Sequence, residues 1–276
     1  LVASDVVPDS PTNNFAVLNP LYRSYWGAGV LSEGNSKWYM SGDGVGTGTF
    51  FPSTGKWYFE VLKLAGSGNN STFGIIEEAN NGYLPNNKVY YRSTGGDITN
   101  FGTTVSTGLA TLAASGDIVG VAFDLDSGDV EFFKNNVSLG STTIASGNLG
   151  KGFGVYLGNG NSNSSDAKTF ILNCGQDSTF AGNKTAGGNS DANGIGDFAY
   201  APPSGYLALC TSNLPDPVID PAQEATADQH FNVYTYVGNG ASQLIGDVVR
   251  EIPDAVSIDQ SLRFDHAGST YLTFDP

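Results

Sequence analysis

The chain has 276 residues and a formal net charge of −15, and 39% of its residues are hydrophobic whereas only 14% are charged. This length allows one large domain, or one ordinary domain with extensions. The acidic balance and the scattered Lys and Arg residues exclude nucleic acid as a partner and disfavour anionic membrane surfaces. No apolar run approaches the roughly 20 residues of a membrane-spanning helix, so no membrane insertion is expected.

Residues 1–24 are predicted to form an extended lead-in, because they combine three prolines with a polar Thr-Asn-Asn stretch. Phe15, Val17 and Leu18 are the side chains expected to pack it. The first residues show neither the charged part nor the apolar part of a signal peptide, and the chain begins with Leu1 rather than Met. We therefore expect a processed product or an internal fragment of a longer protein.

Residues 25–213 are predicted to form an all-β, antiparallel two-sheet sandwich. Short apolar or alternating runs recur there between Gly, Asn and Ser clusters, which is the spacing of such folds. No sustained helical period is present, and the best helical segment is residues 220–229, so very little helix is expected. The predicted strands are Lys37–Met40, Thr47–Phe51, Lys56–Leu64, Thr72–Ile76, Val89–Arg92, Asp117–Asp126, Asp129–Lys134, Gly152–Leu157 and Lys168–Leu172.

Two polar loops and a C-terminal extension are also predicted. Residues 158–165 and 183–196 have nothing to bury, so we expect them to be mobile or ordered by a neighbour or an ion. Prolines at 215 and 217 mark a boundary, after which residues 214–276 are predicted to be β-rich. This extension completes the sandwich, serves as an assembly arm that pairs with another subunit, or begins a further jelly-roll module. Its predicted strands are Phe231–Gly238, Gln243–Val249 and Leu262–Phe274.

The run from Gly116 to Gly140 is the clearest single signature. Apolar residues alternate along Val119–Leu125 and therefore share one face of a strand, with small residues opposite. Ser127-Gly128 permits a tight reversal, and Val130–Lys134 returns as the partner strand. Asn135-Asn136 then makes a second turn, since Asn tolerates the left-handed backbone conformation.

These residues resemble the SPRY domain family. Gly55–Val61 (Gly-Lys-Trp-Tyr-Phe-Glu-Val) resembles the opening strand motif of the family, and Phe170–Gly175 follows the hairpin as the closing strand. The similarity covers residues 26–213 and implies a bent antiparallel sandwich that binds a partner and performs no catalysis. Asn173-Cys174 stands before Gly175, where the family usually has an aromatic residue, and this departure bears on the packing of the last strand.

A narrower resemblance links flanking segments to large structural proteins of tailed bacteriophages that embed a SPRY domain. It rests on residues 12–21, 202–215 and 236–240, while residues 258–264 and 269–272 resemble the first strand of a concanavalin-like jelly roll in those proteins. The resemblance implies a virion protein of the tail or fibre class in an extracellular particle. Its implied partners are other virion proteins, copies of itself as a homo-oligomer, and a host-surface glycan or protein.

Two other functions stay open at this point. A purely structural virion role such as capsid decoration is one alternative, because proline-bounded terminal segments often gain order from adjacent subunits. A cellular lectin-like adhesin is the other. Both alternatives share the absence of enzymatic activity.

Four aromatic residues in or near loops are the predicted binding residues, namely Trp26, Tyr83, Tyr90 and Tyr91. Tyr and Trp offer a broad amphipathic contact area for sugars and protein epitopes. The alternative for each residue is an ordinary place in the sandwich core, since aromatic residues are common on strand faces.

No catalytic, cofactor or metal site is predicted. Neither histidine lies beside a nucleophile-elbow pattern, and no phosphate-binding loop, dinucleotide fingerprint or zinc spacing occurs. Residues 124–129 and 189–197 superficially resemble cation loops, but the first lacks the bidentate Glu and is interpreted as an acidic hairpin turn. Cys174 and Cys210 are interpreted as buried free thiols, with a disulfide as the alternative.

Overall fold

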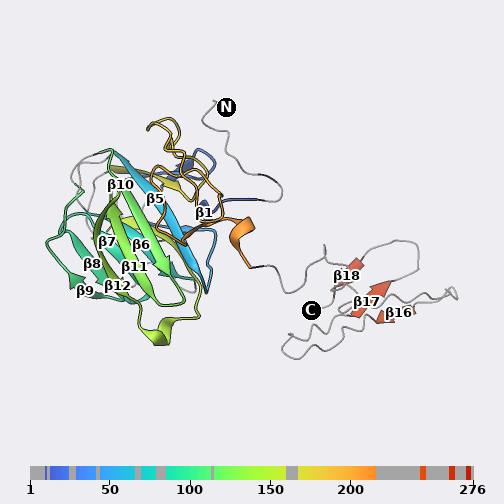
Figure 1. Cartoon of the computed structure of the whole chain (residues 1–276). Helices are drawn as coiled ribbons and strands as arrows, with labels where there is room; N and C mark the ends of the chain where they lie inside the picture. Colours follow the sequence, from blue (N-terminus) through green and yellow to red (C-terminus); the bar gives the residue numbers. More distant parts are fainter. Residues whose placement is uncertain are drawn as a thin grey trace. The chain divides into compact units, whose positions relative to one another are not determined.

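The structure is a computed structural model that describes residues 10, 13–24, 29–41, 44–65, 70–78, 85–112, 115–159, 167–215, 243–246, 261–264 and 272–274. The chain divides into two compact units, Leu1–Leu214 and Pro215–Pro276. The regular structure of the described residues consists of strands and of the short 3-10 turns η2 (Pro85–Asn87), η3 (Ser146–Asn148) and η4 (Thr211–Asn213). The predicted all-β, two-sheet antiparallel sandwich is confirmed (Figure 1).

The first sheet is built from antiparallel pairs. In spatial order its strands are β1 (Leu18–Ser24), β4 (Val45–Gly48), β13 (Phe153–Asn159), β6 (Ser71–Glu77), β7 (Lys88–Arg92), β8 (Asp97–Asn100) and β9 (Thr103–Ser106). β1 pairs with β4 through an irregular register between Leu18 and Arg23, so part of the segment that the sequence predicts as a lead-in is an edge strand of this sheet.

The second sheet packs against the first. In spatial order its strands are β12 (Val137–Thr143), β11 (Asp129–Lys134), β10 (Ile118–Asp124), β5 (Lys56–Ala65), β14 (Ala167–Asn173), β3 (Lys37–Ser41) and β2 (Val30–Ser32). A short strand, β15 (Leu207–Ala208), runs parallel to the start of β5, whereas the other pairs of this sheet are antiparallel.

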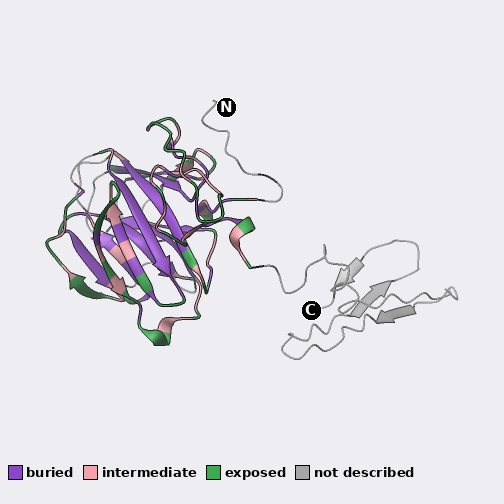
Figure 2. Ribbon diagram, in the orientation of Figure 1, coloured by how far each residue is buried: buried purple, intermediate pink, exposed green. Residues whose placement is uncertain are grey.

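One apolar core fills the space between the two sheets. Val119, Val121 and Phe123 of β10 are fully buried in it, on the face that the alternating sequence pattern predicts. Phe73 of the first sheet meets Phe170 of the second edge to face, with ring centroids 5.3 Å apart. β5 and β10 are buried along nearly their whole lengths because they also have neighbours on their other face (Figure 2).

The segment 174–214, which we call the arm, covers that other face of the second sheet (yellow to orange in Figure 1). Phe198 of the arm packs edge-on against Tyr58 of β5, with ring centroids 5.3 Å apart. Phe180 packs in a second cluster with Leu62 and Ile171. The arm therefore buries the outer side chains of β5, β10 and β14, although it contains little regular structure.

A buried carboxyl group fastens the arm to β5. Glu60 Oε1 accepts hydrogen bonds from Tyr200 N at 2.9 Å and Tyr58 Oη at 3.2 Å, and Oε2 accepts from Ala199 N at 2.9 Å and Asn173 Nδ2 at 3.2 Å. Burial raises the pKa of Glu60 from 4.5 to about 7, although hydrogen bonds from the two backbone amides oppose the rise. Asn173 thus completes the Glu60 site at the position where the sequence departs from the family pattern.

Residues 183–196 of the arm, which the sequence predicts to be mobile or held by a neighbour or an ion, are held by hydrogen bonds within the arm. Asp191 is buried, and its Oδ1 accepts hydrogen bonds from Asn193 N and Ile195 N at 2.8 Å each. Its Oδ2 accepts from Ala208 N at 2.8 Å. The loop is therefore ordered by neighbouring residues, which is one of the predicted outcomes, although the prediction that it has nothing to bury is wrong because Asp191 is buried.

The two cysteines are free thiols, and both are buried. Cys174 belongs to the core between the sheets, whereas Cys210 belongs to the apolar cluster beneath the arm.

The second unit contains a three-stranded antiparallel sheet with the order β16 (Gln243–Gly246), β17 (Ser261–Phe264) and β18 (Leu272–Phe274). The predicted strand 231–238 and the predicted helix 220–229 lie outside the described residues. Among the residues that the structure describes, no helix is long and apolar enough to span a bilayer.

Candidate functional site

The structure describes two of the four predicted binding residues, because Trp26 and Tyr83 lie outside the described residues. Tyr90 and Tyr91 are neighbours on β7, so successive side chains point to opposite faces of the first sheet. Tyr91 is fully buried and Tyr90 is half-buried. Of these two described residues, Tyr90 is the one that a partner can reach.

Tyr91 belongs to the core between the sheets. Its ring contacts Phe132, with centroids 6.3 Å apart, and its hydroxyl group donates a hydrogen bond to the carbonyl of Ala110. Burial raises the pKa of Tyr91, and the nearby carboxylates of Asp117 and Asp97 raise it further. Tyr91 is therefore a core residue, which is the alternative that the sequence analysis gave for it.

Tyr90 lies on the outer face of the first sheet, next to Tyr156 of β13. Gly74 of β6 stands between them, since its register partners are Tyr156 on one side and Tyr90 on the other. A Cβ atom at Gly74 would lie 2.0 Å from the carbonyl oxygen of Val89, so no side chain fits there. The two tyrosine rings therefore meet across the glycine, with centroids 5.9 Å apart.

Lys88 supports both rings from the same strand as Tyr90. Its Nζ lies 4.6 Å from the ring centroid of Tyr156 and 5.7 Å from that of Tyr90. Lys88 and Thr72 each donate a hydrogen bond to Tyr156 Oη, at 3.2 and 3.1 Å. Burial lowers the pKa of Lys88 to about 8, while the neighbouring Tyr90 acts in the opposite direction. We call this cluster, together with Arg92, the tyrosine face.

Arg92 and Tyr90 are the accessible members of the tyrosine face. The guanidinium group of Arg92 binds the carboxylate of Asp97 on β8 through Nε and Nη2, and its side chain remains 33% exposed. Thr99 of β8 is the register partner of Tyr90 on one side and of Thr104 of β9 on the other, and Thr104 is exposed. Tyr156 and Lys88 lie beside Tyr90 on the same face and are buried, so the accessible residues have fixed neighbours.

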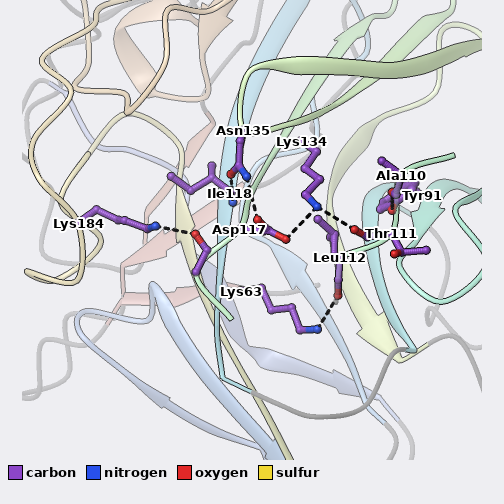
Figure 3. A network of polar contacts seen from close by, with 11 residues as sticks. Lys63, Tyr91, Ala110, Thr111, Leu112, Asp117, Ile118, Lys134, Asn135 and Lys184 are labelled. Carbon is purple, nitrogen blue, oxygen red and sulfur yellow. Dashed lines mark hydrogen bonds and ion pairs between the residues drawn. The ribbon is translucent and has the colours of Figure 1, made fainter. Parts of the chain in front are cut away.

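A polar network behind Tyr91 fixes the segment that leads into β10. Four side chains from different parts of the first unit each donate a hydrogen bond to a backbone carbonyl of residues 110–116 (Figure 3). They are Tyr91 to Ala110, Lys134 to Thr111, Lys63 to Leu112 and Lys184 to Gly116. The arm thus contributes Lys184 to a site otherwise made by the two sheets.

Asp117 is the negatively charged residue that faces the lysines of this network. Its Oδ2 lies 3.3 Å from Lys134 Nζ, and its Oδ1 accepts a hydrogen bond from Asn135 Nδ2 at 2.8 Å. Burial lowers the pKa of Lys63, and Asp117 partly restores it. Each of these donors binds a protein oxygen atom, so the network serves to hold the loop in place.

The predicted acidic hairpin turn lies between β10 and β11. Asp124 Oδ1 accepts from the amides of Asp126 and Ser127, and its Oδ2 lies 3.2 Å from Lys56 Nζ. Burial acts to raise the pKa of Asp124, but these hydrogen bonds outweigh it and lower the pKa. Within the described part of the chain, no group of three or more His, Cys, Asp or Glu side chains could hold a metal ion.

The sequence did not single out Tyr156, Lys88 or Arg92. Lys88 and Arg92 are two residues before and after Tyr90, so period-two alternation along β7 places them on one face. That signal was available in the predicted strand Val89–Arg92. Tyr156 is 66 residues from Tyr90 by number, and only the sheet order brings the two together.

The two packed antiparallel sheets form a SPRY-like sandwich. Residues 56–164 match the family model described as the SPRY domain, and the chain therefore contains a SPRY domain. No curated protein matches the sequence.

Three solved structures are similar to the chain in fold. The SPRY domain of human HERC1 is 12% identical with a TM-score of 0.47, and the match covers 56% of this chain and 96% of that one. The PSpry domain of TRIM65 is 14% identical with a TM-score of 0.43, covering 58% and 92%. Stonustoxin is 14% identical with a TM-score of 0.43, covering 58% and 27%.

Proposed function

We propose that this protein is a non-enzymatic binding protein whose SPRY sandwich holds a partner protein on the tyrosine face. SPRY domains are generally protein-binding modules. The carrying observation is that Tyr90 and Arg92 are accessible on the first sheet, whereas the arm covers the corresponding face of the second sheet. Tyr and Arg are the residue types that contribute most to protein interfaces, and both are held here by buried neighbours, which lowers the entropy lost on binding.

The experiment selects peptide ligands from a displayed random library on the immobilised full chain, and then measures their affinity for variants. We expect the selected peptides to lose at least about tenfold in affinity on Tyr90→Ala and on Arg92→Ala. The matched control is Tyr39→Ala, because Tyr39 is an exposed tyrosine (44%) on the second sheet. The proposal would be overturned if peptide affinity were unchanged by Tyr90→Ala and Arg92→Ala but fell on Tyr39→Ala. That result would place the partner surface on the second sheet.

The finer proposal is a virion protein of the tail or fibre class that contributes to attachment at a host-surface protein or glycan. Its support is the resemblance of residues 12–21, 202–215 and 236–240 to phage structural proteins that embed a SPRY domain. Particles that lack the protein yet adsorb to host cells at the normal rate would contradict the attachment role. A position in the capsid lattice instead of the distal tail would favour the alternative of a decoration protein.

A further inference from the structure

The charged side chains on the tyrosine face come from two neighbouring strands. Lys88 and Arg92 are two residues before and after Tyr90 on β7, so all three lie on one side of the first sheet. Asp97 of β8 is the register partner of Arg92 and therefore lies on the same side. The tyrosine face and Asp97 thus carry two basic side chains and one carboxylate, in a chain whose net charge is −15.

The cation is the more accessible half of the pair formed by Arg92 and Asp97. The side chain of Arg92 is 33% exposed, whereas that of Asp97 is 10% exposed. Nε and Nη2 of Arg92 both donate to Asp97 Oδ2, so Nη1 has no partner within the described part of the chain. A guanidinium group has five N–H donors and commonly binds carboxylates through two of them. Arg92 therefore has donors left for a second carboxylate, beside the half-buried ring of Tyr90.

On the basis of the proposed function, we propose that the partner segment on the tyrosine face is an extended acidic peptide. One carboxylate of the peptide binds Arg92, and an apolar or aromatic side chain two residues away packs on Tyr90. Residues two apart in a strand are about 6.6 Å apart, both on β7 and in an extended peptide, so the two contacts match in spacing. Packing on the ring also excludes water from the neighbouring ion pair, which strengthens it.

The charges on the second sheet favour the same partner and the same surface. Asp126 and Asp129 are exposed in and next to the turn between β10 and β11. An acidic peptide is repelled from this turn and attracted to Arg92, whereas a basic peptide has the opposite preference. Charge complementarity therefore selects the tyrosine face for an acidic peptide.

The test selects peptides from a displayed random library on the immobilised full chain and discards those that also bind the Tyr90→Ala chain. We expect the remaining peptides to carry Asp or Glu two positions from an aromatic or aliphatic residue more often than the unselected library does. The strongest of them is then synthesised, and its dissociation constant is measured at about 0.05 and 0.5 M salt. Binding should weaken at the higher salt concentration, because salt screens the ion pair.

A double-mutant cycle assigns the carboxylate of the peptide to Arg92. Arg92→Gln in the chain, and replacement of the acidic peptide residue by its amide, should each weaken binding by about tenfold. The two changes together should weaken it little more than either alone, because both remove the same contact. The matched control is Lys151→Gln, which removes a partly exposed cation that pairs with Glu77 of the same sheet, and it should change the affinity by less than about twofold.

The amide form of the peptide leaves the protein unchanged, so the test holds even where Arg92→Gln fails to fold. Tyr90-dependent peptides without acidic enrichment, or additive effects in the cycle, would overturn the acidic peptide while leaving the proposed function intact. Binding of sialyllactose, an acidic sugar, through Tyr90 when no peptide binds there would overturn it as well. Selected peptides that all bind the wild-type and Tyr90→Ala chains equally well would instead contradict the proposed function itself.

Discussion

The two outer faces of the SPRY sandwich differ in what lies on them. On the second sheet, Tyr58, Leu62 and Ile171 are buried beneath the arm, and the buried carboxyl group of Glu60 fastens it. On the first sheet, the corresponding layer holds Tyr90 and a paired arginine that remain accessible. Both faces contain tyrosine. Tyr58 on the second sheet is covered by the arm, whereas Tyr90 on the first sheet is accessible and is held by Tyr156 and Lys88.

This difference shows that the same sheet architecture can contribute to stability on one face and to recognition on the other. The covered face is largely apolar, and the buried carboxyl group of Glu60 on it accepts hydrogen bonds from four donors. The tyrosine face is polar, and its ring contacts and cation–π contacts are made within the sheet itself. Substitutions on the two faces should therefore change different properties.

The largest effect is expected from truncation of the apolar anchor of the arm. Phe198→Ala removes a fully buried ring that packs on Tyr58, so the free energy of unfolding should fall by about 3–5 kcal/mol. Tyr90→Ala removes a half-exposed ring and should cost about 1 kcal/mol. Urea unfolding of both variants measures the contrast. Equal losses would show that the two faces contribute to stability in the same way.

The pH dependence of stability should come from the covered face through Glu60. Its pKa in the folded protein is about 7, above its ordinary value of 4.5, so the folded state binds more protons than the unfolded state between these values. Stability from this group is therefore fully present below pH 4.5 and is lost as pH rises through 7, by about 2–3 kcal/mol between pH 5 and 8.

Glu60→Gln is the variant that isolates this effect. The amide does not titrate, so the loss of unfolding free energy between pH 5 and pH 8 should be smaller than in the wild-type chain by about 2 kcal/mol. The variant also has a donor where Glu60 accepts, which lowers its stability at both pH values, so the change with pH is the informative quantity. Parallel pH profiles of the two proteins would contradict the raised pKa of Glu60.

Much of the sandwich could be predicted from the sequence, since buried strands carry strong apolar patterns. The predicted run Asp129–Lys134 coincides with β11, and the strand predicted within Asp117–Asp126 contains β10. The prediction missed β1, β2, β8, β9, β12 and β15. β8 and the edge strand β9 have the sequences Asp-Ile-Thr-Asn and Thr-Thr-Val-Ser. Such short polar strands have few apolar residues, so no periodicity marks them.

The candidate site could be predicted only in part, because it depends on strand order. An aromatic-rich segment at Tyr90 and Tyr91 was evident, and alternation along a strand implies that only one of the two can face outward. Which one does so depends on the position of the core. The contact of Tyr90 with Tyr156 depends on a three-strand register through Gly74, and the role of Glu60 depends on a segment about 140 residues further along the chain.

A smaller effect should separate the two neighbouring tyrosines. Tyr91→Phe removes the hydroxyl group that binds the Ala110 carbonyl, so it should lower the free energy of unfolding by about 1 kcal/mol. Tyr90→Phe should change it by no more than a few tenths of a kcal/mol, since Tyr90 is half-exposed. Urea unfolding of the two single variants measures this difference. A larger loss for Tyr90→Phe would mean that its hydroxyl group has a structural role.

The smallest perturbation uses the two native thiols as reporters of the two apolar clusters to which they belong. Cys210 belongs to the apolar cluster that Phe198 of the arm forms with Tyr58 of β5, whereas Cys174 belongs to the core between the sheets. Burial raises the pKa of both thiols, which slows their reaction with alkylating reagents. The arm is held largely by side-chain hydrogen bonds to irregular backbone, so it should open more often than the sandwich. Cys210 should therefore be alkylated faster than Cys174 in the native protein. Phe198→Ala should increase the alkylation rate at Cys210 more than at Cys174. Peptide mass analysis after timed labelling measures both rates. Equal alkylation rates at both thiols would instead mean that the arm does not open separately from the sandwich.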